Sequence, residues 1–269
     1  LTANNSTAVG YNALALDTGG SNTAVGSSAL DANTTGVRNI AIGLNALGVA
    51  STSTDNIAIG DNAGNAITTV GHRNIAIGTD AGGALTIGTE NIFIGYNAGL
   101  APTNNSYNIA IGNYALGGAT FAAEATIAIG YQAGDAISSG ARNTAVGYQS
   151  LSAIVTASDS TAVGYQALIL DTGGSNTAVG SGAGDGITTG TGNVALGLNA
   201  LGGASFGAAT NNIGIGNSAG IAITASGNQN VMIGTSAGAA ITTGDDNVLI
   251  GYQAGDAFDL ESQNIAIGT

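Results

Sequence analysis

A five-residue motif recurs 16 times along this chain of 269 residues, at intervals of 16 to 19 residues. It reads Asn, Ser or Thr, then Ile, Val or Thr, then any residue, then Ile, Val or Leu, and it closes on Gly. A period this regular indicates a solenoid, in which each repeat forms one coil and buries its apolar side chains only by stacking on its neighbours. We therefore expect an all-β fold, a parallel β-solenoid (β-roll or β-helix) of about 16 coils with repeats of about 17 residues.

Two positions of the motif carry the aliphatic residues. The third residue before the closing glycine is β-branched in every repeat, and the residue just before the glycine is always Val, Ile or Leu, as in Ile40 and Ile42. Residues two apart in a strand point to the same side of it. We interpret this aliphatic stripe as the face of the strand that packs in the core.

The other face of the strand begins with asparagine in 13 of the 16 repeats and continues mostly with alanine. Stacked in register, these amides would hydrogen-bond from coil to coil and form a ladder. The alternative is that each asparagine only ends a turn. No charged residue occupies any of these four strand positions, which indicates that both faces are covered. The predicted ladder comprises Asn39, Asn56, Asn74, Asn91, Asn108, Asn143, Asn176, Asn193, Asn212, Asn230, Asn247 and Asn264.

The remainder of each coil has its own pattern. Alanine follows three residues after the closing glycine in all but one complete coil, where Ser150 stands, and the next residue is Leu or Gly. Segments such as Ala240-Ile241-Thr242-Thr243-Gly244 predict a second short strand that ends in a glycine turn. Length variation and charge concentrate just after this segment, as at Arg38, so we place this corner on the exposed surface.

A longer period overlies the short one. The stretch from Asn5 to Gly26 returns almost unchanged from Asp159 to Gly180, an offset of 154 residues. We expect a single β-solenoid array over residues 1–269, built from nine-coil blocks that start near residues 5 and 159. The chain begins and stops inside the repeat pattern, so we interpret it as an excerpt of a longer array.

Composition excludes several classes of partner. The formal net charge is −13, with only three Lys and Arg residues in total, so a footprint for nucleic acid or anionic lipid is absent. The chain has no cysteine, which removes disulfides and thiolate metal sites, and it has no long apolar run that would insert into a membrane. With 44% hydrophobic residues the chain should be ordered.

Catalytic chemistry is not expected. The lone histidine, His72, lies on a corner without a recurring partner, and we interpret it as a solvated loop residue. Segment 59–64 fits one unit of the hexapeptide acyltransferases, but such units do not follow one another here and a general base is missing. A calcium β-roll would need a Gly-Gly-x-Gly-x-Asp repeat that is absent. We predict no enzyme, with no catalytic, cofactor-binding or metal-binding residues.

Two binding functions stay open as alternatives to a structural role. An ice-binding face needs a regular outward array of hydroxyls, and the Thr-Thr pairs supply a candidate for it. A glycan-binding face needs exposed aromatic rings. Tyrosine follows the closing glycine in six coils, at Tyr11, Tyr96, Tyr131, Tyr148, Tyr165 and Tyr252.

The motif, as in segments 39–43 (Asn-Ile-Ala-Ile-Gly) and 108–112, resembles the repeats in the heads of trimeric autotransporter adhesins and the arrays of phage tail-fibre proteins. The resemblance covers the whole chain through a short unit. It implies a homotrimer of parallel β-rolls around a common axis, in a structural fibre on a cell or virion surface. A host receptor or a surface glycan would then be the partner. A single-chain solenoid that covers its own strand face is the alternative to the trimer.

Overall fold

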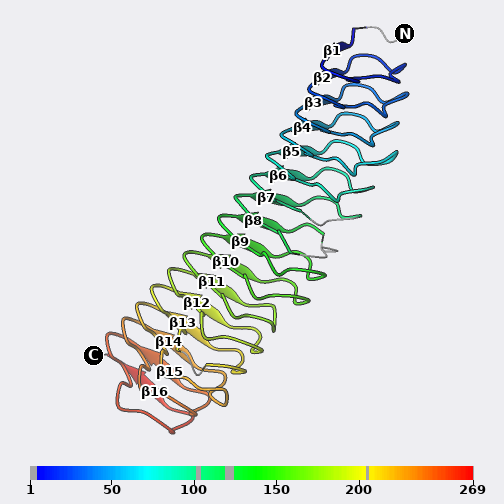
Figure 1. Ribbon diagram of the computed structural model, residues 1–269. Helices are drawn as coiled ribbons and strands as arrows, with labels where there is room; N and C mark the ends of the chain where they lie inside the picture. The colour runs from blue at the N-terminus through cyan, green and yellow to red at the C-terminus, as the bar shows by residue number, and fades with distance from the viewer. Residues whose placement is uncertain (1–4, 101–103, 119–123, 204–205, 269) are drawn as a thin grey trace. The chain divides into compact units, whose positions relative to one another are not determined.

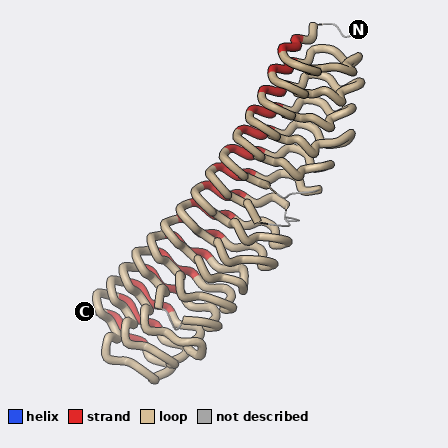
Figure 2. The backbone as a smooth tube through the Cα atoms, in the orientation of Figure 1, coloured by secondary structure: helices blue, strands red, loops and turns tan. Residues whose placement is uncertain are grey.

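The computed structural model describes residues 5–100, 104–118, 124–203 and 206–268. Within these ranges the chain forms 16 short strands and no helix, and the expected all-β solenoid is confirmed. The chain divides into two compact units, Leu1–Ser139 and Gly140–Thr269. Figures 1 and 2 show how each unit is built from coils that each carry one strand on the same side.

The first unit contains eight strands of three residues each: β1 (Thr7–Val9), β2 (Thr23–Val25), β3 (Ile40–Ile42), β4 (Ile57–Ile59), β5 (Ile75–Ile77), β6 (Ile92–Ile94), β7 (Ile109–Ile111) and β8 (Ile127–Ile129). Each strand pairs in parallel with the strand of the next coil, and equivalent residues lie opposite one another, as Ala58 lies opposite Ala76. The order of strands in space is therefore their order in the sequence.

The second unit repeats this arrangement with β9 (Thr144–Val146), β10 (Thr161–Val163), β11 (Thr177–Val179), β12 (Val194–Leu196), β13 (Ile213–Ile215), β14 (Val231–Ile233), β15 (Val248–Ile250) and β16 (Ile265–Ile267). Pairing is again parallel and in register, for example Ala162 opposite Ala178. The prediction of one array of nine-coil blocks stays a prediction.

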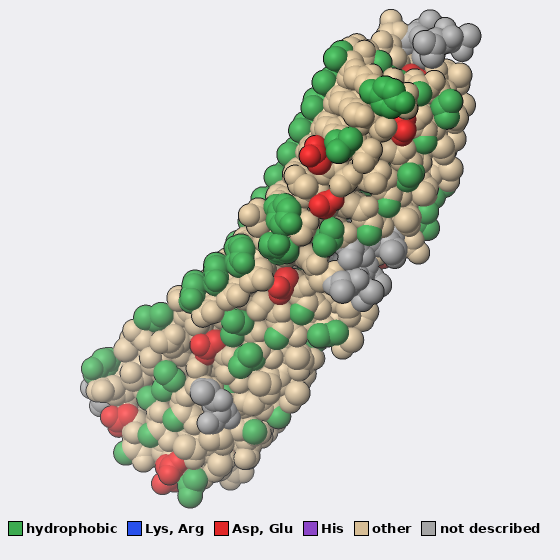
Figure 3. All heavy atoms as spheres, viewed as in Figure 1, with side chains coloured by type: hydrophobic (Ala, Val, Ile, Leu, Met, Phe, Trp, Pro, Cys, Tyr) green, Lys and Arg blue, Asp and Glu red, His purple; other side chains and the backbone are tan. Residues whose placement is uncertain are grey.

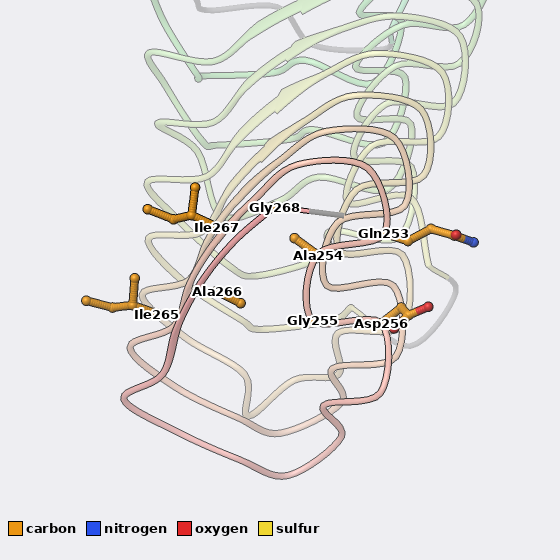
Figure 4. Close-up of a pocket in the computed structure, with 8 residues that line it drawn as sticks. All are labelled: Gln253, Ala254, Gly255, Asp256, Ile265, Ala266, Ile267 and Gly268. Atoms are coloured by element: carbon orange, nitrogen blue, oxygen red, sulfur yellow. The ribbon is translucent and has the colours of Figure 1, made fainter.

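The aliphatic stripe lies on the outside of the coil, so its interpretation as the core face is wrong. In β4 the middle residue Ala58 is fully buried, while Ile57 and Ile59 on either side of it are half-buried. Figure 4 shows the same alternation in the last coil, where Ile265 and Ile267 point away from the coil and Ala266 points inward. The coil interior therefore receives the alanine and the asparagine of each strand, and the isoleucines face outward.

Most coils bury one large side chain in the interior beyond the strand, and a few bury two, as with Leu151 and Ile154. In many coils a leucine four residues after the closing glycine fills it, as Leu47 does. Where that position is glycine, a residue three positions later fills the space: a Cβ on Gly64 would lie 3.0 Å from Ile67 Cδ1 and 3.1 Å from Leu47 Cδ2. The backbone there is left-handed, with φ of 51° at Leu47 and 56° at Gly64. The position therefore suits glycine, or a residue such as leucine whose burial offsets the backbone strain.

The closing glycine of the motif is fixed by backbone packing. Gly43 has a φ of 136°, and a Cβ on it would lie 2.4 Å from the carbonyl oxygen of Gly60 in the next coil. Neither the dihedral angle nor the space accepts a side chain. This close approach explains why the motif ends in glycine in every repeat.

The predicted second strand of each coil is wrong. Opposite the strand, successive coils are joined by single hydrogen bonds such as that from Thr68 N–H to the carbonyl oxygen of Thr86 at 2.8 Å. Only one isolated bridge, between Ile187 and Gly207, is formed outside the strands of the described residues. Left-handed residues such as Asn62 and Gly64 interrupt the extended backbone that a strand requires.

Candidate functional site

The asparagines at the start of the strands lie inside the coil and hydrogen-bond from one coil to the next. The main-chain N–H of Asn56 donates to Asn39 Oδ1 at 3.0 Å, and Asn56 Nδ2 donates to the same oxygen at 3.3 Å and to the carbonyl oxygen of Gly71 at 2.9 Å. The contact repeats along Asn22, Asn39, Asn56, Asn74, Asn91 and Asn108 in the first unit, and along Asn176, Asn193, Asn212, Asn230, Asn247 and Asn264 in the second.

These amides hold the backbone rather than a ligand. All except the partly exposed Asn264 are buried, and each amide between two others uses its oxygen as a double acceptor and its nitrogen as a donor to a turn carbonyl. Asn143 makes part of the same pattern, with Nδ2 donating to the carbonyl oxygen of Ala157 and Oδ1 accepting the N–H of Ser160. Buried polar groups that are paired in this way stabilise the fold.

Serine replaces the asparagine at Ser6 and Ser160, and a buried aspartate takes over the contacts. Ser160 Oγ donates to Asp171 Oδ2 at 2.9 Å, and Asp171 Oδ1 accepts from the N–H of Gly173 at 3.0 Å and from Asn176 Nδ2 at 3.1 Å. Burial outweighs these hydrogen bonds and raises the pKa of the Asp171 carboxyl. Asp17 is buried in the equivalent place and accepts from Ser6 Oγ.

Sequence reasoning missed these two aspartates. The signal was present, because Asp17 and Asp171 both open an Asp-Thr-Gly-Gly segment in the stretch that repeats at an offset of 154 residues. An acidic residue conserved between two copies of a block, in a segment with little other charge, indicates a buried structural role.

The main unassigned surface is the outward face of the strands. It consists of the first and third residue of every strand, all of them Ile, Val, Leu or Thr. In the first unit Figure 3 shows hydrophobic side chains following the edge along which the strands lie. The side chains are about 6.6 Å apart along each strand and about 4.8 Å apart from coil to coil. The result is a regular, uncharged and apolar surface.

The corner that carries the charges is a ladder of ion pairs between neighbouring coils. Arg38 pairs with Asp55 at 2.6 Å, Arg73 with Glu90 at 2.6 Å and Arg142 with Asp159 at 2.7 Å. The hydrogen bond from Arg142 lowers the pKa of the Asp159 carboxyl. All three arginines of the chain are thus engaged with acids, and these exposed pairs contribute little to stability.

His72 is not merely a solvated loop residue. Its side chain is half-buried, and Nδ1 accepts the main-chain N–H of Thr54 in the preceding coil at 2.9 Å. Ser106 and Ser158 provide the same acceptor at equivalent corners. His72 is therefore one of several side chains that satisfy a backbone donor at this corner.

In the Thr-Thr segments the first threonine uses its hydroxyl to bind the next coil, whereas the second is exposed, as at Thr35 and Thr69. Thr34 Oγ1 donates to the carbonyl oxygen of Ser51 at 3.0 Å, and Thr68 Oγ1 donates to that of Thr86 at 3.0 Å. The same contact recurs in the second unit, where Thr224 Oγ1 donates to the carbonyl oxygen of Thr242 at 2.9 Å. Because these hydroxyl protons bind the next coil, only the second threonine of each pair is left for an outward hydroxyl array.

The described residues lack two features. They contain no group of three or more His, Cys, Asp or Glu side chains that could hold a metal ion. They also contain no helix long and apolar enough to cross a membrane. Comparison with models of known protein families and with curated protein sequences gives no match. The outward strand face and the tyrosines beside it are therefore the candidate functional surfaces.

Proposed function

We propose that this chain is a rigid segment of a structural fibre on a cell or virion surface, assembled from parallel copies of itself that pack through their outward strand faces. The observation that carries the proposal is the row of outward Ile and Val side chains, which continues from coil to coil within each unit. Exposed apolar surfaces of this extent mark sites of association.

A second copy of the chain is the partner that fits this face. The ridges formed by the side chains repeat at the coil spacing, and an identical solenoid has grooves at the same spacing over the same length. No charged residue of either copy would be desolvated, because none lies on these positions. With two outward positions on each of its eight strands, the face of one unit approaches the about 20 to 30 residues a side that stable interfaces use.

Three copies are favoured over two. The resemblance to autotransporter heads and tail-fibre arrays implies a trimer, and three equivalent faces around one axis leave no apolar face exposed at the end of assembly. The asparagine ladders and the parallel backbone pairing make each copy stiff without any ligand. Such an object suits a shaft or spacer that holds other domains away from a surface.

Solution mass tests the proposal directly. Light scattering coupled to size exclusion should give three times 25.6 kDa for the wild-type chain. The variant Ile42→Glu/Ile77→Glu places two charges on the outward face of the first unit and should reduce the mass to that of one chain, because a buried unpaired carboxylate opposes association.

A matched control has the same added charge away from the face. Thr35→Glu/Thr69→Glu lies on the exposed opposite side of the coil and should keep the mass of the wild type. A wild-type mass of 25.6 kDa would overturn the proposed assembly and favour a self-contained solenoid, and an ice-recrystallisation assay would then test the binding alternative.

A further inference from the structure

Three tyrosines on consecutive coils form an aromatic cluster at the corner that follows the strands. Tyr96, Tyr114 and Tyr131 come from the coils of β6, β7 and β8. The ring centroids of Tyr96 and Tyr114 are 5.4 Å apart at an interplanar angle of 82°, and those of Tyr114 and Tyr131 are 6.5 Å apart at 78°. Both contacts are edge-to-face, so each of them covers a face of only one of its two rings.

The cluster is exposed and held in place. Tyr96 and Tyr131 expose 45% and 43% of their surface. A hydrogen bond with Tyr96 raises the pKa of the Tyr114 phenol, which ties the two rings together. The backbone under them is also paired, since the Tyr114 N–H donates to the carbonyl oxygen of Tyr96 at 3.0 Å. Rings that are fixed before a ligand arrives lose little conformational entropy when it binds.

An exposed amide accompanies the rings. Asn113 lies next to Tyr114 on the surface, and its Oδ1 accepts the main-chain N–H of Tyr96 at 3.3 Å. Its Nδ2 has no acceptor among the residues that the structure describes. Apolar ring faces next to an amide donor match a molecule that has a C–H face and a rim of hydroxyl groups.

We propose that Tyr96, Tyr114 and Tyr131 form a binding platform for a neutral glycan, whose pyranose rings lie on the tyrosine faces and whose hydroxyls contact Asn113. The platform covers two coil steps, about 10 Å, which suits a short oligosaccharide segment. Anionic glycans are disfavoured, because the formal net charge is −13 and each of the three arginines pairs with an acid.

The second unit provides a natural control. Tyr148 and Tyr165 lie 5.3 Å apart with an interplanar angle of 10°, so they are stacked on each other. Each ring covers one face of its neighbour, and less ring surface is left for a ligand. Removal of Tyr165 deletes the same chemical group as removal of Tyr114 and leaves the three platform rings in place.

Electrophoresis of the full chain through native gels that contain a soluble polysaccharide tests the platform. We expect hydroxyethyl cellulose or galactomannan to retard the wild type, and alginate to leave its mobility unchanged. Tyr114→Ala should weaken the retardation about two- to tenfold, the loss of one aromatic contact. Tyr114→Phe keeps the ring and Tyr165→Ala removes a tyrosine outside the platform, so both should behave as the wild type, and none of these variants changes the net charge.

Several results would overturn the proposal. One is the absence of retardation in both neutral gels, and another is an equal loss in Tyr114→Ala and Tyr165→Ala. A third is a change in solution mass for Tyr114→Ala with unchanged thermal unfolding, which would assign the rings to contact between copies instead of to a glycan. The mass measurement on the wild type is separate, so a failure of the fibre assembly is distinguishable from a failure of the glycan site.

Discussion

Strands β3 to β8 and strands β9 to β11 present different outward faces on the same backbone. The first group has isoleucine at both outward positions, whereas the second has threonine followed by valine, as in Thr161 and Val163. Within each group the strands pair in register, and the middle residue is buried in every one. The coil geometry thus tolerates a large change in outward chemistry.

The interior differs between the same regions. In the coils of β3 to β7 asparagine follows asparagine, while at β10 Ser160 and Asp171 replace the amide. The closing glycines stay the same in both. The comparison shows that backbone contacts between glycines recur in both regions, that the polar contacts inside the coil vary within limits, and that the outward side chains vary without a change in the coil.

The closing glycines should be the most sensitive positions in both regions. A Cβ on Gly60 would lie 2.6 Å from the carbonyl group of Gly78, and one on Gly164 would lie 2.3 Å from the carbonyl oxygen of Gly180. We expect Gly60→Ala and Gly164→Ala each to lower the free energy of unfolding by about 3 kcal/mol or more, measured by chemical denaturation.

Gly83→Ala is the matched control, because its added Cβ would lie 3.1 Å or more from every neighbour and its backbone is not left-handed. A loss of stability in this control as large as in Gly60→Ala would contradict the importance of the glycine contact. A marked difference in stability loss between Gly60→Ala and Gly164→Ala would show that the close glycine contact does not contribute equally in the two regions.

The asparagine ladder should be more sensitive to truncation than the serine that replaces it. Asn74→Ala removes the acceptor for the N–H and Nδ2 of Asn91 and leaves Asn56 Oδ1 and the carbonyl of Gly88 with fewer donors. We expect a loss of about 2–4 kcal/mol from several buried groups that lose partners. Ser160→Ala should cost about 1–2 kcal/mol, because the hydroxyl donor to Asp171 and a long acceptor contact for the Asn176 N–H are lost.

Denaturation of both variants beside Thr69→Ala, an exposed corner substitution, checks this order. Equal losses at positions 74 and 160 would mean that stability does not depend on which side chain spans the coils. A loss at position 69 as large as that at position 74 would mean that the ladder has no special role.

The sequence predicted the coils but assigned the strand faces incorrectly, and the reason is physical. Both faces lack charge, so apolarity alone could not tell core from outside. Size compensation could have done so: Phe93 occupies the middle of β6, and glycine stands beside it at Gly82 in the preceding coil and at Gly99 in its own coil, where an added Cβ would collide with its ring. A large residue that is compensated by small residues beside it indicates a packed interior. The outward isoleucines show no such compensation.

The tyrosine platform could be predicted only in part. Tyr96 and Tyr131 share a position in the repeat and were expected to line up. Tyr114 lies one residue further along its coil, and its edge-to-face contacts depend on the path of the corner. The alternation of left-handed residues that shapes this path has no simple sequence signature, because Asn, Gln, Ser, Asp and Tyr all adopt it.

The buried aspartate should make the two regions differ in their response to pH. Burial raises the pKa of Asp171 above its value in the unfolded chain, about 3.9. The stability that this group contributes is therefore fully present below pH 3.9 and is lost as the pH rises through the folded pKa. Asp171→Asn should remove this dependence, so that the unfolding temperature of the wild type falls relative to the variant as the pH rises from about 4.

Thermal unfolding of the wild type and of Asp171→Asn at a series of pH values checks the sign. Asp17 is present in both proteins, so the difference between the two curves isolates Asp171. A wild type that gains stability relative to the variant between pH 4 and 7 would show that the hydrogen bonds from Ser160, Gly173 and Asn176 outweigh burial.

The corner ion pairs should give the smallest effect. Arg142 lowers the pKa of Asp159, so the stability from this pair is present above the unfolded pKa of the carboxyl and is lost as the pH falls through its folded pKa. Both side chains are exposed, and solvent screens the pair. We expect Arg142→Gln to leave the unfolding temperature within measurement error at physiological salt. A loss comparable with that of Ser160→Ala would mean that the corner, and not only the interior, sets how β9 and β10 stack.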